Sequence, residues 1–198
     1  MSKVILLTIG VTAALVVYFI LTVYILPQSY QTYFIPRKPV PEVLDVNMPA
    51  RVTLGQPFTI TVTGINNGEE ADIQTISIGF PNLTSASNVK VLSHNFRQTP
   101  LLIKIGEKVG AGYAGTAETV NAQYPMVEAM SRPWVHGNLY SIRLQITPED
   151  RGQFTVFVKS VAFPSWEHAH WPLDGLIDPQ KEFVKSYQIE VTTNTLNY

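Results

Sequence analysis

The sequence contains no cysteine among its 198 residues. Disulfides, thiolate nucleophiles, cysteine-ligated zinc and iron–sulfur clusters are therefore excluded. Charged residues are also scarce, at 15% of the chain, and the formal net charge is −1. Nucleic acid binding needs clustered lysine or arginine against the phosphates, so the composition excludes a nucleic acid partner.

Recognisable catalytic motifs are missing as well. No GxSxG turn accompanies the four histidines, so the sequence offers no serine hydrolase site. Residues 110–115 read Gly-Ala-Gly-Tyr-Ala-Gly and match the GxGxxG pattern. That pattern binds a dinucleotide only inside a βαβ unit, and no alternation of strands and helices surrounds it here. We expect no catalysis by this chain alone, and a role as the non-catalytic subunit of a membrane metalloenzyme stays open.

The most prominent feature that is present is the run Val4–Leu26, which is apolar or small throughout and carries no charge. At ~1.5 Å per residue, a helix of this length crosses a ~30 Å hydrocarbon core. A secretory signal peptide is the alternative, but its apolar region is ~7–15 residues long and ends at a small-x-small cleavage site. Residues 24–29 offer no such site. We predict one transmembrane helix over 4–26.

Flanking charges and small residues refine this prediction. Lys3 precedes the run, whereas Arg37 and Lys38 lie well beyond its end, which favours an inward N-terminus. The rest of the chain would then lie on the extracytoplasmic side of the plasma membrane. Gly10 and Ala14 have the small-xxx-small spacing that lets a second helix approach closely in lipid, so they are candidate partner contacts.

A Pro-rich segment, 27–42, follows the predicted helix. Its prolines favour an extended backbone of ~3.1 Å per residue, so we expect a stiff spacer. About 43–194 remain as one domain.

This domain shows the period of two that half-buried strands require. Phe58, Ile60 and Val62 alternate with threonines, and Asn66-Asn67-Gly68 supplies a turn whose residues tolerate positive φ. Further candidate strands are 73–80, 89–96, 101–105, 139–147, 153–163 and 183–192. Short alternating strands without helical periodicity favour an antiparallel β-sandwich. Helix formers interrupted by Pro125 predict a short helical insertion at about 110–132.

Two motifs resemble known β-sandwich families. Asp150-x-Gly152-x-Phe154-x-Val156 resembles the corner that leads into strand F of immunoglobulin-like domains, with Phe in place of Tyr and Val in place of the disulfide Cys. The segment 55–62, Gly-Gln-Pro-Phe-Thr-Ile-Thr-Val, followed by the turn at 66–68, is similar to the opening hairpin of CARDB-type adhesion modules. These resemblances imply an immunoglobulin-like β-sandwich with a binding role.

A further resemblance is to the cupredoxin-type domain of the B subunit of membrane copper monooxygenases. It rests on the segments Tyr140–Arg143 and Gly152–Phe157. In that family the second segment carries a His-x-His copper pair, where this chain has Thr155 and Phe157. The resemblance implies a cupredoxin-like sandwich and names copper as the candidate cofactor, held elsewhere or absent.

The segment 166–171, Trp-Glu-His-Ala-His-Trp, is the sharpest candidate site. In an extended chain His168 and His170 project from one face, and imidazole suits copper, zinc or nickel. His136 is the candidate third ligand. Trp166 and Trp171 are candidate contacts to the membrane or to a partner, because tryptophan favours that interface. Asn82 opens an Asn-Leu-Thr glycosylation sequon.

Together these features predict a single-pass membrane-anchored subunit that is not itself catalytic. Its β-sandwich would bind a partner protein in a membrane or cell-envelope complex. Two alternatives remain open: a B-type subunit of a copper monooxygenase-like complex, and a pilin-like filament subunit whose N-terminal helix packs in a fibre core.

Overall fold

The structure is a computed structural model. It describes residues 3–24, 37–109, 121–165, 168–170, 176–177, 179 and 183–193. The predicted contacts Trp166 and Trp171, and the first half of the predicted insertion, lie outside these residues. The chain divides into two compact units, Met1–Arg37 and Lys38–Tyr198, and each is considered by itself.

The first unit contains the helix α1 (Lys3–Tyr24), 22 residues long, within the apolar run. Its described apolar side chains are exposed at neighbouring as well as alternate positions. They are Ile5, Leu7, Ile9, Val11, Leu15, Val16, Val17, Tyr18, Phe19 and Ile20. The helix is therefore apolar all round and not along one face only. Over the residues that the structure describes, no helix meets the length and hydropathy required to cross a membrane.

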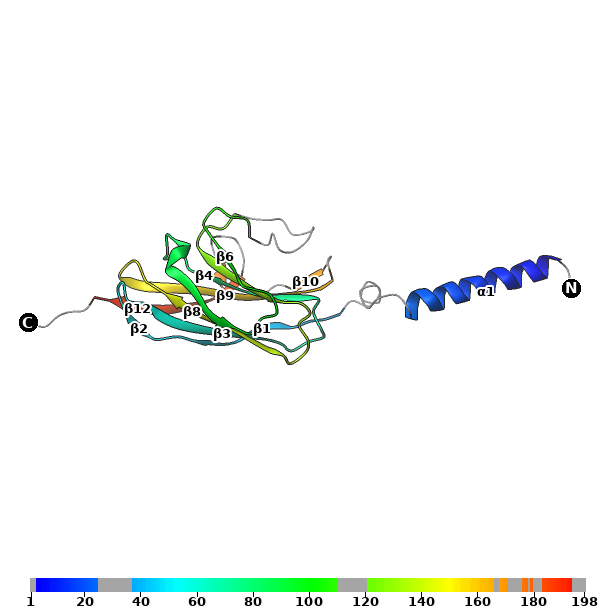
Figure 1. The fold of residues 1–198 in the computed structure, drawn as a ribbon, viewed down its shortest axis with the longest axis horizontal. Helices are drawn as coiled ribbons and strands as arrows, with labels where there is room; N and C mark the ends of the chain where they lie inside the picture. Colours follow the sequence, from blue (N-terminus) through cyan, green and yellow to red (C-terminus); the bar gives the residue numbers. More distant parts are fainter. Residues whose placement is uncertain are drawn as a thin grey trace, which may run out of the picture. The chain divides into compact units, whose positions relative to one another are not determined.

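The second unit is built from strands and one short 3₁₀ helix (Figure 1). The strands are β1 (Pro41–Asn47), β2 (Arg51–Thr53), β3 (Phe58–Asn66), β4 (Ile73–Gly79), β5 (Val89–His94), β6 (Leu101–Ile103), β7 (Met126–Ser131), β8 (Leu139–Ile146), β9 (Gly152–Ser165), β10 (His168–His170), β11 (Leu176–Ile177) and β12 (Phe183–Thr192), and the 3₁₀ helix η1 is Ala86–Asn88.

The strands form two sheets. Sheet A has the order β1-β3-β8-β5, and sheet B has the order β11-β12-β9-β4-β7-β6, with β10 beside β9 and β2 beside β12. Neighbouring strands are antiparallel except for the parallel pair β2 and β12. The sequence-based prediction of a mainly β protein, a two-sheet sandwich, is confirmed.

The core lies between the sheets, where the inward side chains of both meet. In β3, buried and half-buried residues alternate along the whole strand, with Phe58, Ile60 and Val62 inside. Phe58 meets Phe154 of sheet B edge to face, with ring centroids 5.7 Å apart. Val156, the other residue of the immunoglobulin-like motif that faces inward, is fully buried. Apolar packing therefore surrounds both of these inward-facing residues.

The predicted helical insertion at about 110–132 is wrong over its second half. Residues 126–131 form strand β7, which pairs with β4 and β6. Five of its six residues are buried, so both faces of the strand are covered and no alternation marks it in the sequence. Pro125 lies directly before this strand. Strand pairing requires no backbone N–H at that position, so a proline, which has none, is accommodated there.

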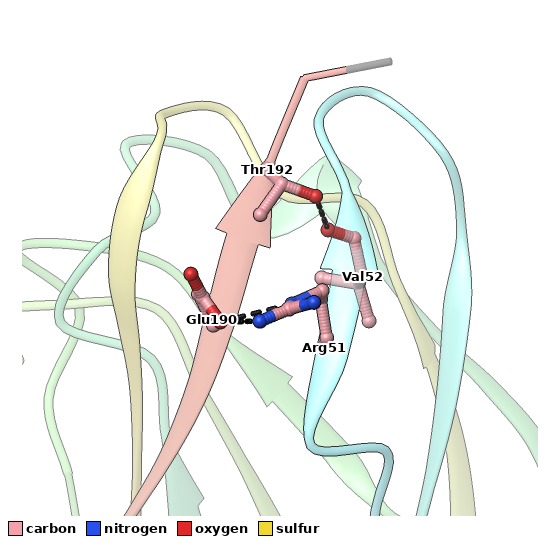
Figure 2. Close-up of polar contacts among 4 residues, drawn as sticks. All are labelled: Arg51, Val52, Glu190 and Thr192. Carbon is pink, nitrogen blue, oxygen red and sulfur yellow. Dashed lines mark hydrogen bonds and ion pairs between the residues drawn. The ribbon is translucent and has the colours of Figure 1, made fainter. Parts of the chain in front are cut away.

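The chain passes from sheet A to sheet B between β1 and β2. β1 pairs with β3 in sheet A, whereas β2 pairs with β12 in sheet B. Figure 2 shows β2 and β12 side by side, with the polar contacts between their side chains and backbone. Arg51 Nε and Nη2 donate to Glu190 Oε2 at 2.9 and 2.7 Å, and Thr192 Oγ1 donates to the carbonyl of Val52 at 3.3 Å. The last strand is thus paired along both of its edges.

Candidate functional site at the chain-entry end

Several loops meet at the end of the sandwich where the chain enters the domain, which we call the chain-entry end. Pro41, the first residue of β1, pairs with Asn66, the last residue of β3. The loop 66–72 bridges to the loop 132–138 through the Ala71–Trp134 pair. Since Ile73 pairs with Phe163, the end of β9 and the strand β10 beside it also lie at this end, as Figure 1 shows.

Asn66 ties three of these segments together from a fully buried position. Its Oδ1 accepts from the amides of Val40 and Gly68, both at 3.0 Å. Its Nδ2 donates to the carbonyls of Glu69 at 2.7 Å and Trp134 at 3.2 Å. A single side chain therefore makes four hydrogen bonds to backbone groups and joins three segments of the chain.

The entering segment is also bound directly to the loop that follows β3. The amide of Asn67 donates to the carbonyl of Val40, and the amide of Glu69 to that of Lys38, both at 3.0 Å. Gly68 packs so closely here that an added Cβ would lie 2.2 Å from the carbonyl oxygen of Lys38. Its φ is not positive, unlike that of Gly137. Close approach of two backbones, rather than a turn conformation, requires this glycine.

An aromatic cluster fills the interior beneath these loops. Trp134 is fully buried and lies 4.6 Å from Tyr140 and 5.7 Å from Phe96, measured between ring centroids. Its indole Nε1 donates to the carbonyl of Asn138 at 3.0 Å. The loop 132–138 is therefore anchored from inside by a large apolar side chain whose polar group is satisfied.

His136, a predicted metal ligand, lies exposed on this loop. Its Nδ1 is 2.9 Å from the carbonyl oxygen of Gly68. A carbonyl only accepts, so Nδ1 carries the proton and Nε2 of the neutral ring keeps its lone pair. This is the tautomer that a metal-ligating histidine adopts when its other nitrogen donates to the backbone.

His168 and His170 are the first and last residues of β10, and their side chains lie outside what the structure describes. In the backbone pairing, His168 lies opposite Ser165 and His170 opposite Ala162. The structure thus brings the backbone of this strand and the loop of His136 to the same end of the sandwich. Among the described residues there is no group of three histidine, cysteine or acidic side chains that could hold a metal.

The other predicted site residues lie on other elements of the chain. Gly10 and Ala14 lie on α1, where a Cβ added to Gly10 would meet nothing within 4 Å. Asn82 is exposed in the loop after β4, and its Oδ1 accepts from the amide of Thr155 at 2.7 Å. Thr155 and Phe157, where the copper family has histidines, lie on β9. Phe157 packs against Tyr124 with ring centroids 5.8 Å apart.

Two buried charges on sheet B were not predicted from the sequence. Ser77 on β4 lies opposite Glu128 on β7 and opposite Lys159 on β9, so the three side chains form a row across three strands. All three are buried. Burial raises the pKa of Glu128, while attraction to Lys159 and a hydrogen bond from Ser77 act in the opposite direction. A charged residue within a strand ordinarily faces solvent, so no sequence signal identified these two as buried.

Comparisons with known proteins bear on the fold alone. No family model and no curated protein matches the sequence. The chain is similar to a CARDB domain from Pyrococcus furiosus solved with di-metal ions, at 8% identity and a TM-score of 0.39, over 78% of this chain and 89% of that one.

Two other solved structures are similar at the same level. A cohesin module from a Clostridium perfringens glycoside hydrolase has 8% identity and a TM-score of 0.36, over 80% of this chain and 99% of that one. A putative membrane anchored protein from Corynebacterium diphtheriae has 12% identity and a TM-score of 0.41, over 80% of this chain and 37% of that one. At these identities the likeness extends only to a β-sandwich.

Proposed function

We propose that the protein is a non-catalytic, single-pass membrane-anchored subunit. Its immunoglobulin-like sandwich lies on the extracytoplasmic side and docks a partner protein of a membrane or cell-envelope complex. The observation that carries the proposal is the exposure of apolar side chains around α1. Neighbouring residues such as Val16, Val17 and Phe19 are all more than half exposed, so no polar face is left to meet water. A helix that is apolar all round is stable when lipid or other helices surround it.

The strand order supports the immunoglobulin-like assignment. The order β1-β3-β8-β5 corresponds to the ABED sheet of immunoglobulin constant domains, and β12-β9-β4 corresponds to the G, F and C strands. The antiparallel pair of β6 and β7 extends sheet B beyond β4, the strand that corresponds to C. In the chain this pair precedes β8. Such a domain supplies a rigid surface for a partner. The described residues of the chain-entry end include no nucleophile turn and no assembled acid–base pair.

The bonds at the chain-entry end also support a docking role. From Lys38 onward the entering chain is fixed to the loop after β3 by Asn66 and by backbone hydrogen bonds. A domain held this firmly at its point of attachment presents its loops in a constant orientation relative to the entering chain. Preorganisation of this kind reduces the entropy lost when a partner binds.

Membrane extraction followed by mild-detergent purification tests this function. The full chain should stay in the membrane fraction at alkaline pH and should purify with a stoichiometric partner. Replacing Val11 and Leu15 by arginine should release it, because each charge costs about 2.5–3.5 kcal/mol at the centre of a helix in lipid. Val11→Leu with Leu15→Ile is the matched apolar control. A wild-type chain found in the soluble fraction, or purified only as a monomer, would refute the proposal.

A second candidate is a metal-binding subunit, and one observation favours it. The loop of His136 and the strand that carries His168 and His170 lie at the same end, and the His136 ring exposes a nitrogen with a free lone pair. Imidazole nitrogens suit copper, zinc and nickel, and copper is the candidate cofactor.

Metal analysis of the purified full chain tests this candidate. Stoichiometric copper that is lost from a His168→Ala, His170→Ala double variant would support it. Asn138→Ala changes the same loop without removing an imidazole and should leave the metal content unchanged. A wild-type chain that retains no metal after addition of copper and dialysis rules the candidate out.

A further inference from the structure

Large apolar side chains are exposed together at the chain-entry end. Val40, in the entering segment, is 43% exposed, and Leu44 in β1 is 54% exposed. Val135 and Leu139, in and just after the loop 132–138, are 37% and 50% exposed. Single exposed apolar residues are ordinary on a protein surface, whereas several gathered at one end need an explanation.

The pairing of the strands places these residues near one another. Leu139 lies opposite Ile65, which in turn lies opposite Glu42, so one row crosses β8, β3 and β1. Leu44 lies at the register shift in β1, two residues after Glu42. Val40 accepts a hydrogen bond from Asn67 at the end of the same strand pair. Leu139, Leu44 and Val40 therefore lie along one side of the chain-entry end. Val135 follows Trp134 in the loop at the same end, and we call these four residues the apolar rim.

At the opposite end of the sandwich, the described turns 54–57, 80–88 and 147–151, which join β2 to β3, β4 to β5 and β8 to β9, contain no exposed large apolar side chain, whereas Ile105, after β6, is 49% exposed. The apolar rim belongs to the end that follows α1 in the chain, with the residues 25–37 between them.

Charge at this end is mixed, because the exposed Asp45 and Glu42 lie near the rim as well as cationic residues. Lys38 and Arg132 are exposed beside the rim. Glu69 accepts a hydrogen bond from the amide of Lys38 at 2.7 Å, and Glu42 accepts one from Asn67 Nδ2 at 2.8 Å. Exposed cationic side chains next to apolar ones are the combination that lipid headgroups and glycerol backbones favour.

We infer that the apolar rim of Val40, Leu44, Val135 and Leu139 lies in the interfacial layer of the bilayer, with the sandwich standing on its chain-entry end. This inference rests on the proposed membrane anchor and adds a second, peripheral contact to it. That contact limits the tilt of the domain, so its far loops face away from the lipid. A partner would then meet a domain of fixed height and orientation.

Site-specific fluorescence in vesicles tests the inference, and the absence of native cysteine allows a single label at each chosen position. The full chain is reconstituted into vesicles of phosphatidylcholine and phosphatidylglycerol, with a polarity-sensitive dye on Leu139→Cys or Val135→Cys. The matched control is Gln56→Cys, which is exposed in a turn at the opposite end. Leu15→Cys in α1 reports insertion of the anchor itself.

A headgroup quencher should reduce the emission at 139 and 135 several-fold more than at 56, and an acyl-chain quencher should reduce it at 15. Equal quenching at 139 and 56 with strong quenching at 15 would overturn the interfacial contact and leave the anchor intact. No quenching at 15 would refute the anchor and the inference together. Emission at 139 that is shifted to the blue but unquenched would point to a covering protein, and would also overturn the inference.

Discussion

Replacing Asn66 by alanine removes the side chain that joins the entering chain, the loop after β3 and the loop before β8. Four hydrogen bonds to backbone groups are lost at a position that is fully buried. At about 0.5–1.5 kcal/mol net for each bond, the expected loss is about 2–6 kcal/mol.

Denaturant unfolding of the full chain in detergent measures this loss, and hydrogen exchange localises it. The amides of Val40 and Gly68 donate to Asn66 Oδ1, so both should exchange faster in the variant. Asn67→Ala is the matched control, because that exposed side chain donates one hydrogen bond, to Glu42 Oε2, among the described residues. It should cost less than about 1 kcal/mol. If the two variants unfold at the same denaturant concentration, the assigned role of Asn66 is wrong.

Three further changes test other parts of the domain. Gly68→Ala should cost about 1–3 kcal/mol and speed protease cleavage near Lys38, because its Cβ would lie within 2.2 Å of backbone that cannot rotate away. Glu128 holds its proton to higher pH in the folded chain, since burial raises its pKa above the ordinary value of 4.5. Stability should therefore fall as pH rises above about 4.5, and Glu128→Gln should flatten that slope in denaturant unfolding measured across pH. Arg51→Ala, which removes an exposed ion pair with Glu190, should change the unfolding free energy by less than about 1 kcal/mol.

The strands with one solvent-facing side were predictable from sequence. In β3 and β8 the buried positions alternate with half-buried or exposed ones, so the period of two was visible. Strand β7 was not, because its residues are buried on both faces and form no alternating pattern. Strand β2 is only three residues long and pairs in parallel with the distant β12, so local sequence carries no sign of it.

The candidate site was predictable in part, for a related reason. The topology places the His136 loop and β10 at one end, as expected for loops that precede and follow antiparallel strands. The role of Asn66 could not be predicted, because the sequence Asn-Asn-Gly has the composition of any solvent-exposed turn. Two of its four bonds join segments 26 and 68 residues away, at Val40 and Trp134, and local sequence carries no sign of them.

The row of Glu128, Ser77 and Lys159 shows which surface of the sandwich remains available to a partner. These side chains point away from the core of the sandwich, yet all three are buried. In contrast, Thr59 and Thr61, on the outer face of sheet A, are partly exposed. Buried groups of opposite charge that attract one another cost several kcal/mol when one of them is removed. A docking partner is therefore expected to bind sheet A or the loops at either end, because binding at this row would require uncovering the buried charges.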